Sequence, residues 1–382
     1  MKSTALTLAA AIVACCAAAA EAEITRAPAP KQISKVKVET VAKGLSHPWA
    51  LQFLGDGRLL VTERDGRIRV VGTDGRLSPA IAGVPAVAAS GQGGLLDLAL
   101  APDFATSRLI YFSFSEPRSN GRNGTTLARA RLDLATDGRG GSLADLTVVF
   151  RQKPEYASDM HFGGRIAFVR DGSLFITAGE RAYLRDEAQN PSHDLGKVIH
   201  INADGSIPAD NPKLPGWAPE VWSIGHRNPQ AAAIHPVSGK LWTVEHGARG
   251  GDEVNVPLPG RNYGWPVITY GRDYSGAKIG IGTQKDGMEQ PLYYWDPSIA
   301  PSGMAFYTAD LAPEWKGNLF VGALAGQHLS RLVLDGEKVI AEEQLLRDQA
   351  ERIRDVRQGP DGALYVCTDS SNGRILRVTP AR

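Results

Sequence analysis

Cysteine is scarce in this sequence, which has three among 382 residues, at Cys15, Cys16 and Cys367. The first two lie in an apolar N-terminal stretch, so removal of that stretch leaves Cys367 as the one remaining thiol. An intrachain disulfide is then excluded. Because Cys367 lies in the apolar run 363–368, we expect a small buried core residue rather than a reactive nucleophile.

A strong charge of either sign is also missing. The chain has 42 Lys and Arg against 41 Asp and Glu, a formal net charge of +1, and no run of basic residues. We therefore predict no nucleic-acid partner, because such partners are held by a basic surface. A local group of arginines is still able to bind a small anion, since local and overall charge are separate properties.

No apolar run has the length of a membrane-spanning helix, so we predict no transmembrane segment. The alanine-rich stretch 5–20 follows a basic residue, Lys2, and has the regions of a secretory signal. Residues 20–22 form a small-x-small cleavage site. This pattern predicts a signal peptide over residues 1–22, cleaved after Ala22, and a periplasmic or otherwise exported protein.

A lipoprotein signal is the alternative. In that interpretation residues 12–14 precede Cys15, which is acylated and gives the protein a lipid anchor. Both interpretations predict export. Residues 23–35, which include Pro28 and Pro30, are predicted to be a tether between the signal and the folded part.

Glycine and proline are abundant, at 42 and 24 residues, which indicates many turns, and long helical periodicity is absent. A turn followed by a short run of alternating apolar and β-branched residues recurs at spacings of about 45 to 80 residues. The runs are 59–62, 109–114, 174–177, 241–244, 319–321 and 364–367. Dipeptides ending in glycine at 65–66, 335–336 and 372–373 are typical of tight hairpins.

Six repeated units predict an all-β fold, a six-bladed β-propeller over residues 36–382. The segment 36–41 alternates as a strand does. We expect it to complete the last blade and so remove an exposed edge. A pair of β-sandwich sheets with similar turns is the alternative, but neither the count nor the period of the repeats favours two packed sheets.

Polar clusters lie just outside the repeated runs, where the loops of a propeller carry binding sites. In residues 90–94, Gln92 offers a donor and an acceptor between glycines that let a planar ligand approach the backbone. In residues 160–165, His161 precedes two glycines, and an exposed histidine there is a candidate base. A plain turn and a structural histidine are the respective alternatives.

Three further clusters carry charge. Arg227 and Asn228 lie side by side and can clamp carboxylate or quinone oxygens by directional hydrogen bonds. The run 245–253 combines carboxylates with carbonyls beside glycines, the hard oxygen ligands that calcium takes, without EF-hand spacing. In residues 352–354, strand alternation puts two arginines on one face, which suits a polyanionic ligand. A loop, a solvated turn and a surface strand with salt-bridged arginines are the alternatives.

In this order, the clusters resemble the glucose/sorbosone dehydrogenase family, most closely its soluble aldose sugar dehydrogenases of bacterial periplasms, which depend on pyrroloquinoline quinone (PQQ). The resemblance runs from about Val38 to Pro380. Its most specific stretches are residues 91–97, 161–165, 227–230, 245–247, 250–253, 262–266, 302–307 and 352–356. One such stretch alone would be weak, whereas the ordered set is specific.

The resemblance implies a six-bladed propeller, the fold that the repeat count predicts independently. It implies that PQQ and calcium oxidise an aldose sugar to its lactone, with an electron acceptor that the sequence does not name. His161 is implied as the catalytic base and Arg227 as the residue that polarises the quinone. The residues implied to bind PQQ are Gln92, His161, Arg227, Asn228, Tyr274, Ala323, Leu324, Ala325, Arg352, Ile353 and Arg354.

The same resemblance implies two calcium sites. The catalytic ion is held by the backbone carbonyls of Gly247 and Ala248, with Asp252 reached through water. A second, structural ion lies near Glu253 and Tyr263.

The sequence departs from the family at two positions. Many relatives carry an acidic or amide residue immediately before the base, where this chain has Met160. Relatives often have a lysine where Ala325 stands, so this chain lacks one positive charge for the carboxylates of the cofactor. Both departures predict a lower affinity for PQQ and do not alter the expected type of reaction.

Two other functions are weighed against this one. A calcium-dependent propeller lactonase would have side-chain carboxylates converging on a metal in the channel. A non-catalytic propeller that binds partners by its rim would have no need for Gln92, His161, Arg227 and Arg352 to converge.

Overall fold

The computed structural model describes residues 27–136, 138 and 140–381. The predicted signal peptide, residues 1–22, and the alternative acylation site at Cys15 lie outside the described residues. Among the residues that are described, no helix is both long and apolar enough to cross a membrane.

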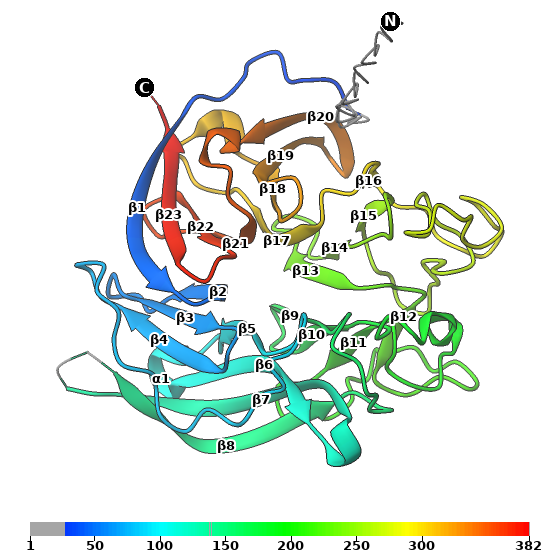
Figure 1. Cartoon of the computed structure of the whole chain (residues 1–382), viewed down its shortest axis with the longest axis horizontal. Helices are drawn as coiled ribbons and strands as arrows, with labels where there is room; N and C mark the ends of the chain where they lie inside the picture. The colour runs from blue at the N-terminus through cyan, green and yellow to red at the C-terminus, as the bar shows by residue number, and fades with distance from the viewer. Residues whose placement is uncertain (1–26, 137, 139, 382) are drawn as a thin grey trace, which may run out of the picture.

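Six antiparallel sheets surround a central axis (Figure 1). Blade 1 has β2 (Pro48–Phe53), β3 (Leu59–Glu63) and β4 (Arg67–Val71), and blade 2 has β5 (Leu95–Leu100), β6 (Leu109–Pro117), β7 (Asn123–Leu134) and β8 (Gly141–Arg151). Blade 3 has β9 (Gly163–Phe168), β10 (Leu174–Ala178), β11 (Lys197–Ile201) and β12 (Val221–Ile224). Blade 4 has β13 (Pro229–Ile234), β14 (Leu241–Glu245), β15 (Asp252–Asn255) and β16 (Tyr293–Trp295).

The last two blades complete the ring. Blade 5 has β17 (Pro301–Phe306), β18 (Leu319–Ala323), β19 (His328–Asp335) and β20 (Lys338–Leu345), and blade 6 has β21 (Ile353–Gln358), β22 (Leu364–Thr368), β23 (Gly373–Pro380) and β1 (Val36–Leu45). The helical segments are short: α1 (Phe104–Ser107), η1 (Ser119–Gly121), η2 (Arg185–Gln189), η3 (Pro313–Trp315) and η4 (Arg347–Gln349). The predicted all-β, six-bladed propeller is therefore confirmed.

The repeated apolar runs all became the second strand of a blade. They form β3, β6, β10, β14, β18 and β22, and residues of these strands are mostly buried. Apolar side chains on both faces fit this position, because each sheet packs between two neighbouring blades. Cys367, in β22, is buried and free, as its apolar surroundings led us to expect.

The first strand closes the ring. β1 pairs with β23 along its whole length, from Val36 opposite Pro380 to Leu45 opposite Gly373. The two ends of the chain thus meet in blade 6, as predicted for residues 36–41, and this pairing removes an exposed sheet edge.

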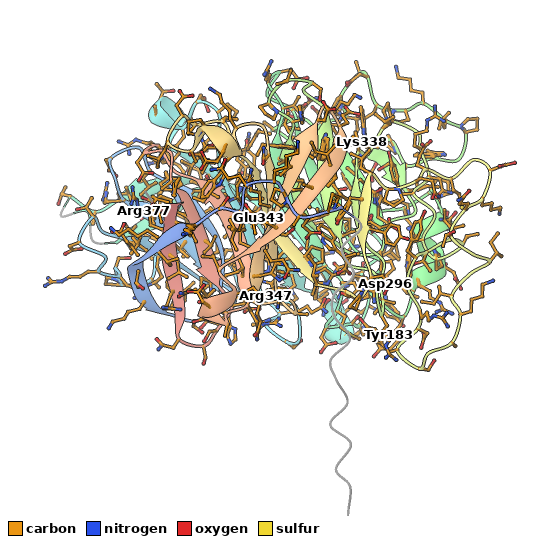
Figure 2. All side chains as sticks on the ribbon, turned by 90° about the horizontal axis from the view of Figure 1, so that it is seen from above. Tyr183, Asp296, Lys338, Glu343, Arg347 and Arg377 are labelled. Atoms are coloured by element: carbon orange, nitrogen blue, oxygen red, sulfur yellow. The ribbon has the colours of Figure 1, made fainter. Side chains whose placement is uncertain are left out.

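The described part of the predicted tether, residues 27–35, lies along blade 5. Pro28 accepts a hydrogen bond from the backbone N–H of Glu342 (3.0 Å), and Ser34 donates its backbone N–H to Glu343 (2.8 Å). Figure 2 shows Glu343 next to this N-terminal segment. These residues are therefore attached to the propeller rather than extended away from it.

A buried ion network crosses the central channel between the first strands of three blades, which we call the inner strands. Arg165 in β9 donates from Nη1 to Asp97 in β5 (3.0 Å) and to Asp355 in β21 (2.8 Å). Arg357, also in β21, donates to the same two carboxylates, at 2.9 Å each. The network joins blades 2, 3 and 6 at the centre of the ring.

Candidate functional site

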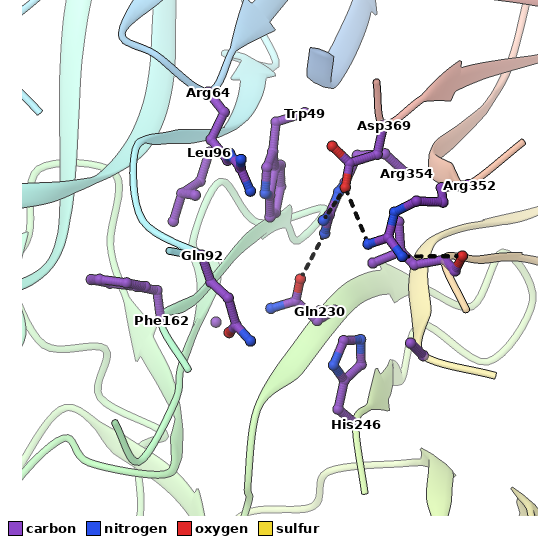
Figure 3. A pocket seen from close by; sticks show the side chains of 13 residues that line it. Trp49, Arg64, Gln92, Leu96, Phe162, Gln230, His246, Arg352, Arg354 and Asp369 are labelled. Atoms are coloured by element: carbon purple, nitrogen blue, oxygen red, sulfur yellow. Dashed lines mark hydrogen bonds and ion pairs between the residues drawn. The ribbon is translucent and has the colours of Figure 1, made fainter. Parts of the chain in front are cut away.

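A cavity of about 240 Å³ opens where the inner strands begin and the second strands end. We call this side of the propeller the pocket face. Figure 3 shows the side chains that line the cavity. The lining residues are Trp49, Arg64, Gln92, Leu96, Phe162, Gly163, Gln230, His246, Ala300, Leu324, Arg352, Arg354 and Asp369. They come from all six blades, as expected for a site on the axis of a propeller.

His161, next to this cavity, forms a buried pair with a carboxylate. Its Nδ1 lies 2.6 Å from Oε2 of Glu180, and both side chains are almost fully buried. Burial lowers the pKa of His161 below its ordinary value near 6.5, and the charge of Glu180 partly opposes that shift. With Nδ1–H donated to the carboxylate, Nε2 is the nitrogen able to accept a proton.

The backbone around His161 is tightly constrained. Its φ is +52°, in the left-handed region, and its N–H donates to Oε1 of Gln92 (2.9 Å). A Cβ on Gly179 would come within 2.1 Å of the carbonyl oxygen of His161, so only glycine fits there. Gln92 thus holds the backbone of His161 in place through its Oε1.

Two arginines reach the cavity from blade 6, Arg352 just before β21 and Arg354 within it. Arg354 is buried and donates to Gln230 (3.0 Å) and to Asp369 (3.0 Å), while its Nε has no partner among the described residues. Arg352 is half-exposed and makes only long contacts, 3.5 Å to Asp369 and 3.4 Å to the Leu324 carbonyl. Ile353 between them is buried in the core, so the predicted alternation of this strand is confirmed.

Arg227 does not line the main cavity, but it lines a second, much smaller cavity that shares His246 with the main one. Its Nη1 donates to the carbonyl of His246 (3.3 Å), and its guanidinium stacks 5.2 Å from the ring of Trp265. Its Nε has no partner in the described part of the chain. His246 lines the cavity, and burial lowers its pKa to about 3, so its imidazole stays neutral.

Several residues expected at the cofactor do not line the cavity. Asn228 is fully buried, and its Oδ1 accepts from Gly163 (3.0 Å) and Gln230 (3.1 Å). Tyr274 is 71% exposed on a turn outside the cavity. Ala323 is buried in the core of blade 5 and Ala325 faces solvent, which leaves Leu324 as the cavity residue of that segment.

The glycine loop 246–251 is held by one carboxylate. Asp252 accepts the N–H of Gly247 (2.7 Å) on one oxygen, and on the other the Ser298 hydroxyl (2.7 Å) and the N–H groups of Ile299 and Ala300 (2.8 and 2.9 Å). Both oxygens are thus occupied by protein donors. Asp252 fixes the loop that carries the Gly247 and Ala248 carbonyls rather than offering a free carboxylate to a metal.

A second, water-sized cavity of about 10 Å³ shares His246 with the main one and is lined in part by Glu245, Glu253 and Tyr263. Burial, together with the neighbouring Glu245, raises the pKa of Glu253 to about 8. Asn255 donates to both carboxylates, at 3.1 Å each, and its own Oδ1 is buried without a partner in the described chain. Two carboxylates beside a small cavity suit a hard cation.

Sequence reasoning missed Glu180, Trp49, Arg64 and Asp369. A signal for two of them was present, because in four blades the second strand has a carboxylate as its last residue or within the two residues that follow it. These carboxylates are Glu63, Glu180, Glu245 and Asp369. Since second strands all end on the pocket face, an acidic residue after such a strand is a candidate partner for a base or an arginine.

This fold and site define a propeller protein that holds a buried histidine–carboxylate pair beside an arginine-lined pocket. The chain belongs to the glucose/sorbosone dehydrogenase family, whose model matches residues 45–377. Family membership identifies it as an oxidoreductase of the sugar dehydrogenase kind.

Named relatives agree with this assignment. The chain is 47% identical to aldose sugar dehydrogenase YliI of Escherichia coli over 352 residues, which cover 90% of this chain and 93% of that protein. It is 32% identical to quinoprotein glucose dehydrogenase B of Acinetobacter calcoaceticus, over 90% and 88% of the two chains. The PQQ-bound aldose sugar dehydrogenase of Streptomyces coelicolor superposes with a TM-score of 0.74 at 30% identity, over 91% and 99% of the chains.

Proposed function

We propose that the protein oxidises aldose sugars to lactones with PQQ and calcium, and that His161 is the general base. The observation that carries this proposal is the buried His161–Glu180 pair beside a cavity rich in arginine. A neutral imidazole with its Nδ1–H held by a carboxylate is the arrangement required for proton abstraction.

The residues of the cavity fit PQQ. The cofactor carries three carboxylates, and three arginines line the cavity against one carboxylate, Asp369. The indole of Trp49 and the side chain of Leu324 supply apolar surface for a planar ring system. The unpartnered Nε of Arg354 is a further donor at the site. When bound, PQQ supplies an electrophilic ortho-quinone that accepts hydride from the sugar.

Calcium would be held at two places, the glycine loop 246–251 and the small cavity that Glu253 and Tyr263 line. The carbonyls of Gly247 and Ala248 are the residues proposed for the catalytic ion, with the loop fixed by Asp252. Glu253 and Tyr263 are proposed for the structural ion. In the second site a bound cation would keep Glu253 ionised, against the raised pKa that burial and Glu245 impose.

The side chains of the protein would position the sugar and the cofactor and would move one proton. His161 would take the proton of the anomeric hydroxyl on Nε2, and Glu180 would stabilise the imidazolium that forms. Arg227, next to His246 under the cavity, would stabilise negative charge that develops on the quinone oxygen. Gln92 holds the backbone of the base.

The two alternatives find less support. Among residues 27–136, 138 and 140–381, no group of three or more His, Cys, Asp and Glu side chains is arranged to hold a metal, which a lactonase of the predicted type needs. A rim-binding propeller has no need for a buried base beside an arginine-lined cavity. Membership of a sugar dehydrogenase family also favours the oxidoreductase.

The proposal is tested by reconstitution. Protein stripped with a chelator should regain sugar-dependent reduction of an artificial dye when calcium and PQQ are both added, and not with either alone, because the metal anchors and polarises the cofactor. Dye reduction in excess chelator would show that calcium takes no part in the mechanism. Activity without added PQQ, in protein shown by absorbance to hold none, would exclude PQQ as the cofactor.

We also propose that the protein is exported to the periplasm. The support is the signal-like sequence of residues 1–22, in which cleavage after Ala22 and acylation of Cys15 are the two alternatives. The mature N-terminal residue, determined by mass spectrometry of the protein from a bacterial periplasm or membrane, decides between them.

A further inference from the structure

Arg64 is a cavity-lining arginine with no assigned role. It follows directly after β3 in blade 1, on the opposite side of Trp49 from Arg352 and Arg354 (Figure 3). Its guanidinium is partly exposed and forms no hydrogen bond or ion pair with any residue that the structure describes. An arginine that points into a cavity without a protein partner is free to bind a ligand.

The cavity has more positive charge than its own carboxylate can balance. Arg64, Arg352 and Arg354 line it, against Asp369 alone. Asp369 is already engaged by Arg354 (3.0 Å) and by His47 (2.9 Å). Burial lowers the pKa of Arg354, Asp369 opposes that shift, and the charges of Arg352 and Arg64 add to it, so the three guanidinium groups are close enough to repel. An anionic ligand relieves that repulsion.

The backbone of Arg64 is held from two sides. Its N–H donates to the carbonyl of His47 (3.1 Å), and its own carbonyl accepts the N–H of Leu95 from blade 2 (3.0 Å). At Gly94 a Cβ would lie 1.9 Å from the carbonyl oxygen of Arg64, so the glycine permits this close contact of two blades. The fold therefore places the Arg64 side chain at the cavity, although no side-chain hydrogen bond or ion pair with the described residues requires it there.

We propose that Arg64 binds a carboxylate of PQQ and supplies the positive charge that this chain lacks at Ala325. This inference rests on the proposed cofactor. Ala325 faces solvent, does not line the cavity and carries no charge, whereas Arg64 lines the cavity from blade 1. Three arginines from blades 1 and 6 would then match the three carboxylates of the ligand.

The test is a titration of calcium-loaded, PQQ-free protein with PQQ, followed by quenching of tryptophan fluorescence and by equilibrium dialysis. Arg64→Gln should raise the Kd by about 10- to 100-fold, because a charge-assisted hydrogen bond to a carboxylate is lost. Arg64→Lys should recover part of that loss. The matched control is Arg76→Gln, an exposed arginine paired with Asp74 outside the cavity, which should leave the Kd unchanged.

A second ligand shows whether the loss of affinity in Arg64→Gln comes from the lost charge or from altered packing. With the trimethyl ester of PQQ, the wild type and Arg64→Gln should bind with equal Kd, since the carboxylates that Arg64 would contact are gone. Equal affinity of the two proteins for unmodified PQQ would overturn the role of Arg64 and leave the proposed function intact. A wild type that binds no PQQ would overturn the proposed function itself. All variants should keep the wild-type melting temperature, because the Arg64 side chain makes no hydrogen bond or ion pair with the described residues.

Discussion

At the scale of single residues, the proposed function assigns the general base to His161, whose ring is paired with the carboxylate of Glu180. Glu180 is on β10's trailing segment and His161 precedes β9, so the first hairpin of blade 3 builds the pair. Burial keeps the imidazole neutral to lower pH than usual, and the carboxylate limits that effect. Both properties are open to direct test.

We expect His161→Gln to bind PQQ and calcium and to fold normally, yet to lose about two to four orders of magnitude in turnover. Glutamine roughly keeps the size of the side chain but cannot accept a proton near neutral pH. The pH–rate profile of the wild type should fall on the acid side below pH 6.5, because protonation occurs only at the lowered pKa, and this limb should be absent in the variant. Near-normal turnover with saturating cofactor would show that another group takes the proton.

Glu180→Gln should reduce turnover by about 10- to 1000-fold and shift the acid limb to still lower pH. The reason is that Glu180 raises the pKa of His161, so removing its charge makes the base weaker. Steady-state rates from pH 4 to 9 provide the measurement. The matched control is Glu187→Gln, which alters a second histidine–glutamate pair, with His193 (2.7 Å), outside the cavity. A profile that does not move in Glu180→Gln would reject a positioning role.

At the scale of elements, the start of β21 presents two arginines with different surroundings. Arg354 is tied to Gln230 and Asp369, whereas Arg352 is half-exposed and only weakly engaged. The same element therefore contributes one arginine that also supports the protein and one that is free for a ligand.

Arg352→Ala and Arg354→Ala should both weaken PQQ binding more than they slow the saturated enzyme, since guanidinium groups hold carboxylates in the ground and transition states alike. Only Arg354→Ala should also lower the melting temperature, because it removes a buried hydrogen-bond donor from Gln230 and from Asp369. PQQ titration and thermal melts test this. Arg374→Ala, which breaks a surface pair with Glu351, is the control. Unchanged cofactor affinity in both cavity variants contradicts the assignment.

At the scale of the whole molecule, the ring is held by closure of blade 6 and by the ion network across the channel. Asp97 in blade 2 accepts hydrogen bonds from Arg165 of blade 3 and Arg357 of blade 6, and its other oxygen accepts the N–H of Ile166. Because these groups are buried, each charge depends on its partners.

Asp97→Asn should therefore destabilise the protein by about 3–5 kcal/mol, the usual cost of leaving a buried charge unpaired. The measurement is the shift of the denaturant midpoint, with the m-value checked for two-state unfolding. Asp310→Asn, which removes an exposed partner of Lys316, should leave the midpoint unchanged. Equal midpoints for wild type and Asp97→Asn would mean that the network adds nothing to the stability of the ring.

The sequence by itself determined the local structure. The apolar runs at 174–177 and 364–367 became second strands because alternating β-branched residues after a glycine turn favour a buried strand in any blade. The facing of Arg352 and Arg354, with Ile353 buried between them, follows from strand geometry alone. The family resemblance was equally local, since it rested on short ordered motifs, and the family model bears it out.

Only the tertiary structure decided which side chains meet. The contact of His161 with Glu180, and of Arg354 with Gln230 and Asp369, joins residues from different strands and blades, and strand alternation does not specify the order of blades around the axis. For the same reason Asn228, polar and beside Arg227, lies fully buried below the cavity, and Arg64 lines it from blade 1. Ring closure brings these segments together, so their positions depend on packing between all six sheets.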